Sequence, residues 1–131
     1  MPFRRHFEQI RQIYGRTLGV NLLCAGKDEE KKLTLFYEGM VDKERLHFVR
    51  YQYYDFHKEC KGDRFDKSQE LVERMSGVSN AFGFSVFRDG VLERQQSGVY
   101  RTNCLDCLDR TNYLQSRLAL FTLTKWLASQ P

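Results

Sequence analysis

A cysteine and an arginine with five residues between them mark one short segment of this chain as a place where chemistry could occur. The segment is RTNCLDCLDRTN, residues 101–112, and the pair is Cys104 and Arg110. A loop with this C-x(5)-R spacing can curl so that its backbone N–H groups point inward and form a nest for an anion. The thiol then lies at the base of the nest, and the guanidinium closes one side. A cysteine-dependent phosphatase requires this spacing.

The expected surroundings of the loop favour a reactive thiolate. Residues 97–103 are expected to be extended and residues 111–128 helical, so the loop would end at a helix N-terminus, which favours anions. Such surroundings lower a cysteine pKa to roughly 3.5–7.5. The planar fork of Arg110 would grip two phosphate oxygens, which a lysine could not do equally well. The expected course is attack of Cys104 on phosphorus, a phosphocysteine intermediate and hydrolysis by water.

Two acidic residues inside the loop, Asp106 and Asp109, would stand beside the phosphate. A carboxylate there would repel a phosphate dianion unless it turns outward or carries a proton. A neighbouring like charge and partial burial both raise a carboxyl pKa, so one of the two could protonate the leaving alkoxide. An aspartate that accepts backbone N–H bonds at a turn or helix start is equally typical. The sequence leaves both interpretations open.

Cys107 forms a C-x-x-C pair with Cys104, and this pair has other interpretations. A zinc site would need two further ligands, but Cys24 and Cys60 are isolated, and the histidines form no H-x(3–5)-H pair. A dithiol redox site does not explain the position of Arg110. We therefore expect no metal site. Cys107 either packs behind the loop or acts as a resolving thiol after peroxide oxidises Cys104.

Taken as a whole, residues 101–112 resemble the signature of the Sac-domain phosphoinositide phosphatases, R-x-N-C-x-D-C-L-D-R-T-N. Every fixed position of that pattern is present: Arg101, Asn103, Cys104, Asp106, Cys107, Leu108, Asp109, Arg110, Thr111 and Asn112. Residues 54–67, YDFHKECKGDRFDK, resemble the family's F-D-F-H-K-E-C-K segment in the branch anchored to endoplasmic reticulum and Golgi, and differ from the synaptojanin branch. HFEQIRQIYG at 6–15 and VNLL at 20–23 resemble the preceding helix and strand. The resemblance therefore covers most of the chain.

The resemblance also implies which residues act. Cys104 would be the nucleophile and Arg110 the phosphate clamp, without a metal or other cofactor. The other loop residues expected to contact the phosphate are Leu105, Cys107, Leu108, Thr111 and Asn112. Myotubularin phosphatases carry the same C-x-D-x-x-D-R spacing, and the Asp before the Arg is implicated there as the acid, which favours Asp109 over Asp106. In the matched upstream segment, the residues expected to supply positive charge for a lipid headgroup, or else to form a solvated basic loop, are His57, Lys58 and Lys61.

The activity that the resemblance implies is removal of a phosphate from the inositol ring of a membrane phosphatidylinositol phosphate. The 4-phosphate is the expected position and the 3-phosphate the alternative. The partner would be the lipid headgroup at a membrane surface, on the cytosolic face of endoplasmic reticulum or Golgi membranes, and we expect no nucleic-acid partner. Two other classes stay open: an inactive truncated fragment or interaction module, and a phosphatase of proteins or soluble phosphates.

Length and composition fit part of such an enzyme. The 131 residues are 41% hydrophobic, enough for one compact core, and the net charge of +4 suits an anionic membrane surface. The N-terminus is charged and amphipathic, unlike a signal peptide, and no stretch approaches the roughly 20 apolar residues of a membrane span. Sac domains are much larger than this chain. We therefore expect residues 1–131 to be the C-terminal part of the catalytic domain, without the N-terminal Sac subdomain or any membrane anchor.

Hydrophobic periodicity predicts helices that alternate with strands. Helices are expected at 3–15, 28–42, 67–76 and 111–128, strands at 18–25, 46–56 and 97–103, and a hairpin over 82–98 that turns at Asp89–Gly90. The apolar face of the second helix is expected to carry Leu33, Phe36, Tyr37 and Met40. This order indicates an α/β fold with a mixed β-sheet flanked by helices. The phosphate loop would lie between a strand and a helix, at the carboxyl end of the strand.

Overall fold

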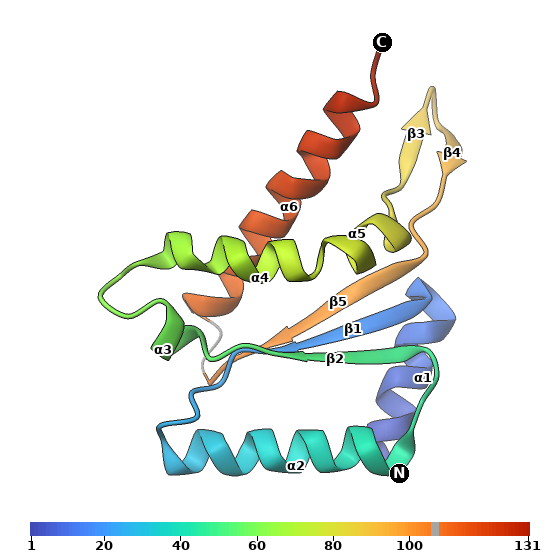
Figure 1. The fold of residues 1–131 in the computed structure, drawn as a ribbon. Helices are drawn as coiled ribbons and strands as arrows, with labels where there is room; N and C mark the ends of the chain where they lie inside the picture. The colour runs from blue at the N-terminus through green and yellow to red at the C-terminus, as the bar shows by residue number, and fades with distance from the viewer. Residues whose placement is uncertain (106–107) are drawn as a thin grey trace.

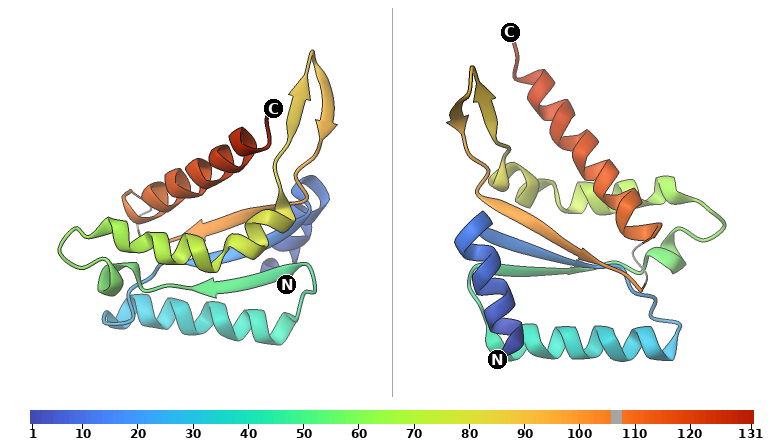
Figure 2. Two further views of the ribbon diagram at one scale, coloured as in Figure 1. Left: turned by 45° about the horizontal axis from the view of Figure 1, so that its top comes forward. Right: turned by 180° about the vertical axis from the view of Figure 1, so that it is seen from behind.

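The computed structural model describes residues 1–105 and 108–131, which form helices packed on both faces of a β-sheet (Figure 1). The helices are α1 (Pro2–Tyr14), α2 (Asp28–Glu44), α3 (Phe56–Glu59), α4 (Gln69–Arg74), α5 (Ser76–Phe82) and α6 (Arg110–Ala128), with a 3-10 helix, η1 (Phe65–Ser68). The strands are β1 (Arg16–Asn21), β2 (Val49–Tyr53), β3 (Val86–Arg88), β4 (Val91–Arg94) and β5 (Gly98–Asn103). Helices α1 and α2 cover one face of the sheet, and α4, α5 and α6 lie on the other (Figure 2). The predicted α/β class is therefore confirmed.

The central sheet is parallel throughout, with strand order β2-β1-β5. Val20 of β1 lies opposite Gln52 of β2 and Thr102 of β5. The antiparallel pair β3–β4 forms a separate two-stranded sheet. The mixed sheet predicted from the sequence is thus wrong for the described residues, because the hairpin projects beside the C-terminal half of α6 instead of joining the central strands (Figures 1 and 2).

The chain leaves β1 and β5 toward opposite faces of the sheet. After β1 it runs to α2 on one face, and after β5 it runs to α6 on the other (Figure 1). Neighbouring parallel strands whose connections diverge leave a crevice at their carboxyl ends, where open α/β sheets usually bind ligands. The C-x(5)-R loop follows β5 at this edge.

The hydrophobic core lies between the sheet and the helices on the α6 side. Its buried members are Leu18, Val20, Leu22, Tyr54, Phe56, Cys60, Leu71, Val72, Met75, Phe82, Cys104, Leu114 and Leu118. Phe65 and Tyr113 pack against this set, with their ring centroids 5.1 Å apart. Tyr54 and Phe56 therefore contribute aromatic rings to the core.

Helix α2 buries only part of the predicted face. Met40 is half-buried, and the ring of Tyr37 packs against Tyr51 of β2 with centroids 5.0 Å apart. Leu33 is exposed, and Phe36 is 73% exposed, whereas Glu30 and Thr34 are buried. Asn21 at the end of β1 donates from Nδ2 to Thr34 Oγ1 at 2.9 Å. Polar contacts therefore add to the packing of Tyr37 in docking α2 against the sheet, and hydrophobic periodicity alone did not identify Glu30 and Thr34.

The predicted helix at 67–76 is instead a succession of the short helices η1, α4 and α5. Met75 separates α4 from α5 with φ −88° and ψ −1°, close to the bridge region of backbone space, which turns the chain. Leu71, Val72 and Met75 are nevertheless buried. The hairpin turn at Asp89–Gly90 is also confirmed, because both residues have the positive φ (51° and 78°) that a tight hairpin turn requires.

We expect Gly98→Ala to destabilise the fold. A Cβ at this position would clash with the buried ring of Phe82 and lie 2.8 Å from the carbonyl oxygen of Arg16. Relief requires movement of a buried ring or a paired strand, at a cost of about 1–3 kcal/mol. Gly77→Ala is the matched control, because a Cβ there meets nothing within 4 Å and alanine favours the helix. Urea unfolding of both variants checks the prediction, and equal midpoints would contradict it.

Candidate active site

The C-x(5)-R loop connects the end of β5 with the start of α6. Cys104 directly follows β5, and Arg110 is the first residue of α6. Asn103 donates from Nδ2 to Asn21 Oδ1 at 2.9 Å, which fixes the end of β5 against the end of β1. The strand, loop and helix predicted around the motif are therefore present. Asp106 and Cys107 lie outside the described residues, so their roles as acid, phosphate contact or resolving thiol stay predictions.

Arg110 is held at the carboxyl edge of the sheet by α2 and by the segment after β1. Its Nη1 donates to Glu30 Oε2 and to the carbonyl oxygen of Leu22, each at 3.2 Å. The same Glu30 oxygen accepts the backbone N–H of Cys24 at 2.6 Å. The side chain of Glu30 is 1% exposed and that of Arg110 is 18% exposed. The guanidinium is thus anchored on its inner side while part of the side chain reaches solvent.

The contacts of Glu30 lower the pKa of its carboxyl group. Burial is the largest single influence and acts to raise the pKa, but the Cys24 N–H bond, Arg110 and Lys27 together outweigh it. Glu30 is therefore charged at neutral pH, and it forms a buried ion pair with Arg110.

We expect the stability that this pair contributes to disappear in acid. Because the pKa of Glu30 is lowered in the folded state, the contribution is present above the ordinary value of 4.5 and is lost as the pH falls through the lowered pKa. Urea unfolding of the wild type and of Glu30→Gln, from about pH 7 to about pH 3, should show a stability difference that shrinks with falling pH. Glu29→Gln removes an exposed carboxylate one residue away and serves as the control. A difference that widens in acid would contradict the assignment.

A polar cavity of about 330 Å³ lies beside Arg110. The charged or basic side chains that line it are Lys27, His57, Lys61, Asp63, Asp109 and Arg110. They come from the residue before α2, from α3 and the segment after it, and from the start of α6. Four basic groups around one cavity suit a phosphorylated ligand. The structure therefore brings His57 and Lys61 together with Arg110.

Asp55 positions α3 at this cavity. Its Oδ1 accepts the N–H of Lys58 at 3.1 Å and caps α3, and its Oδ2 accepts the N–H of Ala25 at 3.1 Å. Helix α3 is thereby fixed to the segment after β1. His57 and Lys61 line the cavity as a result, whereas Lys58 is not among its lining residues.

Asp109 and Cys60 place a carboxyl group and a thiol at the cavity. Asp109 occupies the N-cap position of α6, where its carbonyl oxygen accepts the N–H of Tyr113 at 2.9 Å. Within the described part of the chain its carboxylate makes no capping bond to the helix. The pKa of the Cys60 thiol is raised, chiefly by burial and further by Asp66. Cys60 is therefore protonated at neutral pH and does not compete as a nucleophile.

Cys104 lines a different cavity from Arg110. This cavity of about 550 Å³ lies between α1 and α2, and most of its lining is apolar. Arg101 and His6 also line it, and burial together with Arg101 lowers the pKa of His6. Cys104 is 8% exposed. Cys104 and Arg110 thus lie at the two ends of one loop, but Cys104 lines the apolar cavity and Arg110 lines the polar cavity.

The remaining predicted loop residues differ in exposure. Leu105 and Leu108 are exposed, and Leu105 lines the apolar cavity with Cys104. Thr111 is buried in the first turn of α6. Asn112 donates from Nδ2 to the carbonyl oxygen of Leu108 at 2.7 Å, which ties the end of the loop to the helix. Their contacts with a phosphate stay predictions.

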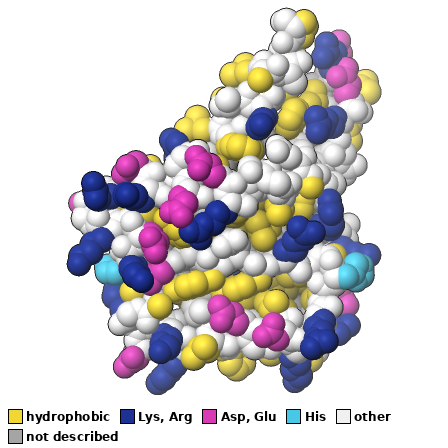
Figure 3. All heavy atoms as spheres, in the orientation of Figure 1, with side chains coloured by type: hydrophobic (Ala, Val, Ile, Leu, Met, Phe, Trp, Pro, Cys, Tyr) yellow, Lys and Arg dark blue, Asp and Glu magenta, His cyan; other side chains and the backbone are white. Residues whose placement is uncertain are grey.

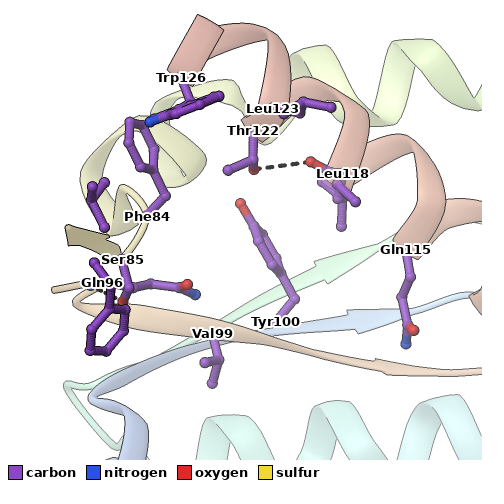
Figure 4. A pocket seen from close by; sticks show the side chains of 13 residues that line it. Phe84, Ser85, Gln96, Val99, Tyr100, Gln115, Leu118, Thr122, Leu123 and Trp126 are labelled. Carbon is purple, nitrogen blue, oxygen red and sulfur yellow. Dashed lines mark hydrogen bonds between the residues drawn. The ribbon is translucent and has the colours of Figure 1, made fainter. Parts of the chain in front are cut away.

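A larger cavity that the described residues form, about 690 Å³, lies elsewhere, between the β3–β4 hairpin, β5 and α6 (Figure 4). Phe84, Tyr100, Leu118 and Trp126 are among the side chains that line it (Figure 4). The lining contains no charged side chain. This cavity therefore offers a phosphate no counter-charge, and size alone does not identify the site.

Positive charge gathers at the edge of the molecule that carries the polar cavity. Figure 3 shows Lys, Arg and His side chains over α3 and the segment after it, with Asp and Glu side chains beside them.

In the part of the chain that the structure describes, no group of three or more His, Cys, Asp or Glu side chains is placed to hold a metal ion. No helix within residues 1–105 and 108–131 combines the length and apolar character needed to cross a membrane.

Sequence reasoning missed Glu30 and Lys27. Lys27 precedes the first residue of α2, and Glu30 follows Asp28 and Glu29, which carry the same negative charge as Glu30 but are exposed. The signal that could have singled out Glu30 is its four-residue spacing from Thr34, because residues at this spacing share one helix face. That face is the one that α2 turns toward the end of β1.

Comparison with known proteins agrees with the motif. Residues 1–61 match the family model of the SacI homology domain. Over 120 residues, 91% of this chain, it is 42% identical to phosphatidylinositol-3-phosphatase SAC1 of Drosophila melanogaster, of which it covers 20%. It is 42% identical to SAC1-A of Danio rerio over 125 residues, 95% of this chain and 21% of the relative. Human synaptojanin-1 is 34% identical over 125 residues, which are 95% of this chain and 8% of that protein. The chain therefore spans about a fifth of the length of its SAC1 relatives, and its predicted resemblance to the Sac-domain phosphatases is confirmed.

Proposed function

We propose that the protein is a phosphoinositide phosphatase that hydrolyses phosphatidylinositol phosphates through a phosphocysteine intermediate. Cys104 is the proposed nucleophile and Arg110 the proposed phosphate clamp. The observation that carries the proposal is the polar cavity at the carboxyl edge of the sheet, where Arg110 meets Lys27, His57 and Lys61. Similarity to phosphatidylinositol-3-phosphatases supports an inositol lipid as the substrate.

In the proposed reaction, the thiolate of Cys104 attacks phosphorus and the bond from phosphorus to the inositol oxygen breaks. Arg110 binds two phosphate oxygens and stabilises the charge of the transition state. Asp109, which lines the cavity, is the proposed proton donor to the leaving alkoxide, and Asp106 is the alternative. Water then hydrolyses the phosphocysteine and releases inorganic phosphate. The attack requires Cys104 Sγ to face the cavity of Arg110.

The proposed substrate is a monophosphorylated headgroup, with the 4-phosphate as the first position to test and the 3-phosphate as the second. The headgroup would be presented at the cytosolic face of endoplasmic reticulum or Golgi membranes. Basic side chains at the cavity edge of the molecule support approach to an anionic lipid surface, because polybasic surfaces are attracted to such membranes (Figure 3).

A second candidate is a non-catalytic module that binds phosphorylated headgroups. The observation that favours it is the position of Cys104, which lines the apolar cavity and not the polar one. Both candidates bind phosphate through Arg110, and turnover separates them.

The test measures phosphate release from four substrates: vesicles that carry phosphatidylinositol 4-phosphate, vesicles that carry the 3-phosphate, a phosphotyrosine peptide and p-nitrophenyl phosphate. The proposal expects faster release from one of the lipids than from either water-soluble substrate. Vesicle binding without release would identify the binding module. Preference for the peptide or for p-nitrophenyl phosphate would assign the protein to another phosphatase class.

A further inference from the structure

Glu30 is the acidic residue at the start of α2 that the fold buries. The two acidic residues before it in the same turn are exposed, whereas Glu30 is 1% exposed. A buried carboxylate is costly unless a cation and hydrogen bonds compensate it. Among the described residues the cations near it are Arg110, at 3.2 Å, and Lys27, at 4.0 Å from the other carboxylate oxygen. The buried charge is therefore compensated by Arg110 together with Lys27 and the Cys24 N–H.

The contacts around Glu30 define the orientation of the guanidinium. Oε2 is itself fixed by the backbone N–H of Cys24 at 2.6 Å, so it is a rigid acceptor. Arg110 Nη1 donates to this oxygen and to the carbonyl oxygen of Leu22. Leu22 and Cys24 belong to the segment that leaves β1. One acceptor, the carbonyl oxygen of Leu22, is therefore part of this segment, and the other, Glu30 Oε2 on α2, is tied to it by the Cys24 N–H. Two acceptors at fixed positions determine the plane of a guanidinium, because its N–H groups point in fixed directions.

Helices α2 and α6 meet at the carboxyl edge of the sheet because the chain leaves β1 and β5 toward opposite faces. Helix α2 carries Glu30 from one face of the sheet, and α6 carries Arg110 from the other (Figure 1). Arg110 is paired with the buried Glu30 and also lines the polar cavity. A guanidinium that the protein already holds in place loses no further rotational freedom when it binds a ligand in the cavity.

We propose that Glu30 is the positioning residue of the phosphate site: it holds the guanidinium of Arg110 in the orientation in which Arg110 binds the phosphoryl group. This inference rests on the proposed function for its effect on turnover. Glu30 itself touches neither substrate nor nucleophile. Its loss acts through Arg110, and chiefly on kcat, because bidentate contact with the phosphoryl oxygens strengthens in the transition state.

The test compares Glu30→Gln with Glu29→Gln, which removes an exposed carboxylate from the same helical turn. Glutamine keeps the shape and one acceptor oxygen but removes the charge. We expect Glu30→Gln to lower kcat about 10- to 100-fold on vesicles with phosphatidylinositol 4-phosphate, with a smaller change in KM. Glu29→Gln should keep the wild-type kcat. The Nε–Hε NMR signal of Arg110 should shift and broaden in Glu30→Gln alone.

Glu30→Asp covers the case in which Glu30→Gln does not fold, because it keeps the charge and withdraws the carboxylate by one methylene. A folded Glu30→Asp or Glu30→Gln with wild-type kcat and an unchanged Arg110 signal overturns the inference. If the wild type shows no turnover, the proposed function fails, and binding of inorganic phosphate followed by NMR decides the inference separately. Weaker phosphate binding in the Glu30 variant than in Glu29→Gln then upholds the positioning role, and equal binding overturns it.

Discussion

Replacement of Cys104 with serine is expected to abolish phosphate release while phosphate binding persists. The hydroxyl has nearly the shape of the thiol, but its pKa is too high for it to ionise in the same surroundings. Loss of a nucleophile of this kind lowers kcat by about a thousandfold or more. The anion-binding groups of the polar cavity, Arg110 and Lys27 among them, are unchanged in this variant. Phosphate release and binding of inorganic phosphate, measured on the same preparation, check the two halves of the prediction.

Cys60→Ser is the matched control for Cys104→Ser. Cys60 is the thiol that lines the polar cavity, and burial raises its pKa, so serine there should leave kcat close to the wild-type value. Turnover that survives in Cys104→Ser and disappears in Cys107→Ser would show that the nucleophile has been assigned to the wrong cysteine. Turnover that disappears in Cys60→Ser, with the fold intact, would move the reaction to Cys60, the thiol that lines the polar cavity.

The local context of the motif was predictable because the signals that define it are local. The extended run before Cys104 and the helical periodicity after Arg110 each span more than one turn or pleat, so strand and helix follow from the sequence alone. The turn at Asp89–Gly90 follows in the same way, because two adjacent residues that tolerate positive φ specify it. The resemblance to the family rests on residues 101–112 and on the further segments 54–67, 6–15 and 20–23.

The pairing of strands was not predictable from such local signals. The sequence places a hairpin between the second and last strands of the sheet, and nothing local determines whether the hairpin joins the sheet or leaves it. The structure separates β3–β4 from β1, β2 and β5, which leaves the sheet parallel. Choice of a strand partner depends on contacts between residues far apart in sequence, and these are weakly encoded in any one segment.

The ion pair between Arg110 and Glu30 was not predictable from the sequence, for a related reason. Glu30 lies 80 residues before Arg110, in a turn with two other acidic residues, and its role follows from burial and not from residue type. The separation of Cys104 from the polar cavity was not predictable either. The C-x(5)-R spacing fixes the order of residues along a loop but does not determine which cavity a side chain lines. Both features depend on how α1 and α2 pack against the sheet.

Replacement of Arg110 with lysine is expected to reduce turnover nearly as much as replacement with alanine, by about a hundredfold or more. Arg110 already donates from Nη1 to Glu30 and Leu22, and the proposed clamp needs further N–H groups in a fixed plane for the phosphate. A lysine ammonium is a compact charge at the end of a flexible stem, so it cannot satisfy the carboxylate and grip two phosphate oxygens in one geometry.

The lysine variant also separates catalysis from folding. In Arg110→Ala the carboxylate of Glu30 stays buried without its guanidinium, which destabilises a protein by about 3–5 kcal/mol. In Arg110→Lys a cation remains beside Glu30, so most of the stability should survive while turnover is lost. Arg117→Lys on the same helix is the matched control, since Arg117 binds Gln69 at 2.8 Å and does not line the polar cavity. Urea unfolding and phosphate release, measured on all three variants, check the prediction. Wild-type kcat in a folded Arg110→Lys would show that the site needs a positive charge at this position and not a bidentate clamp.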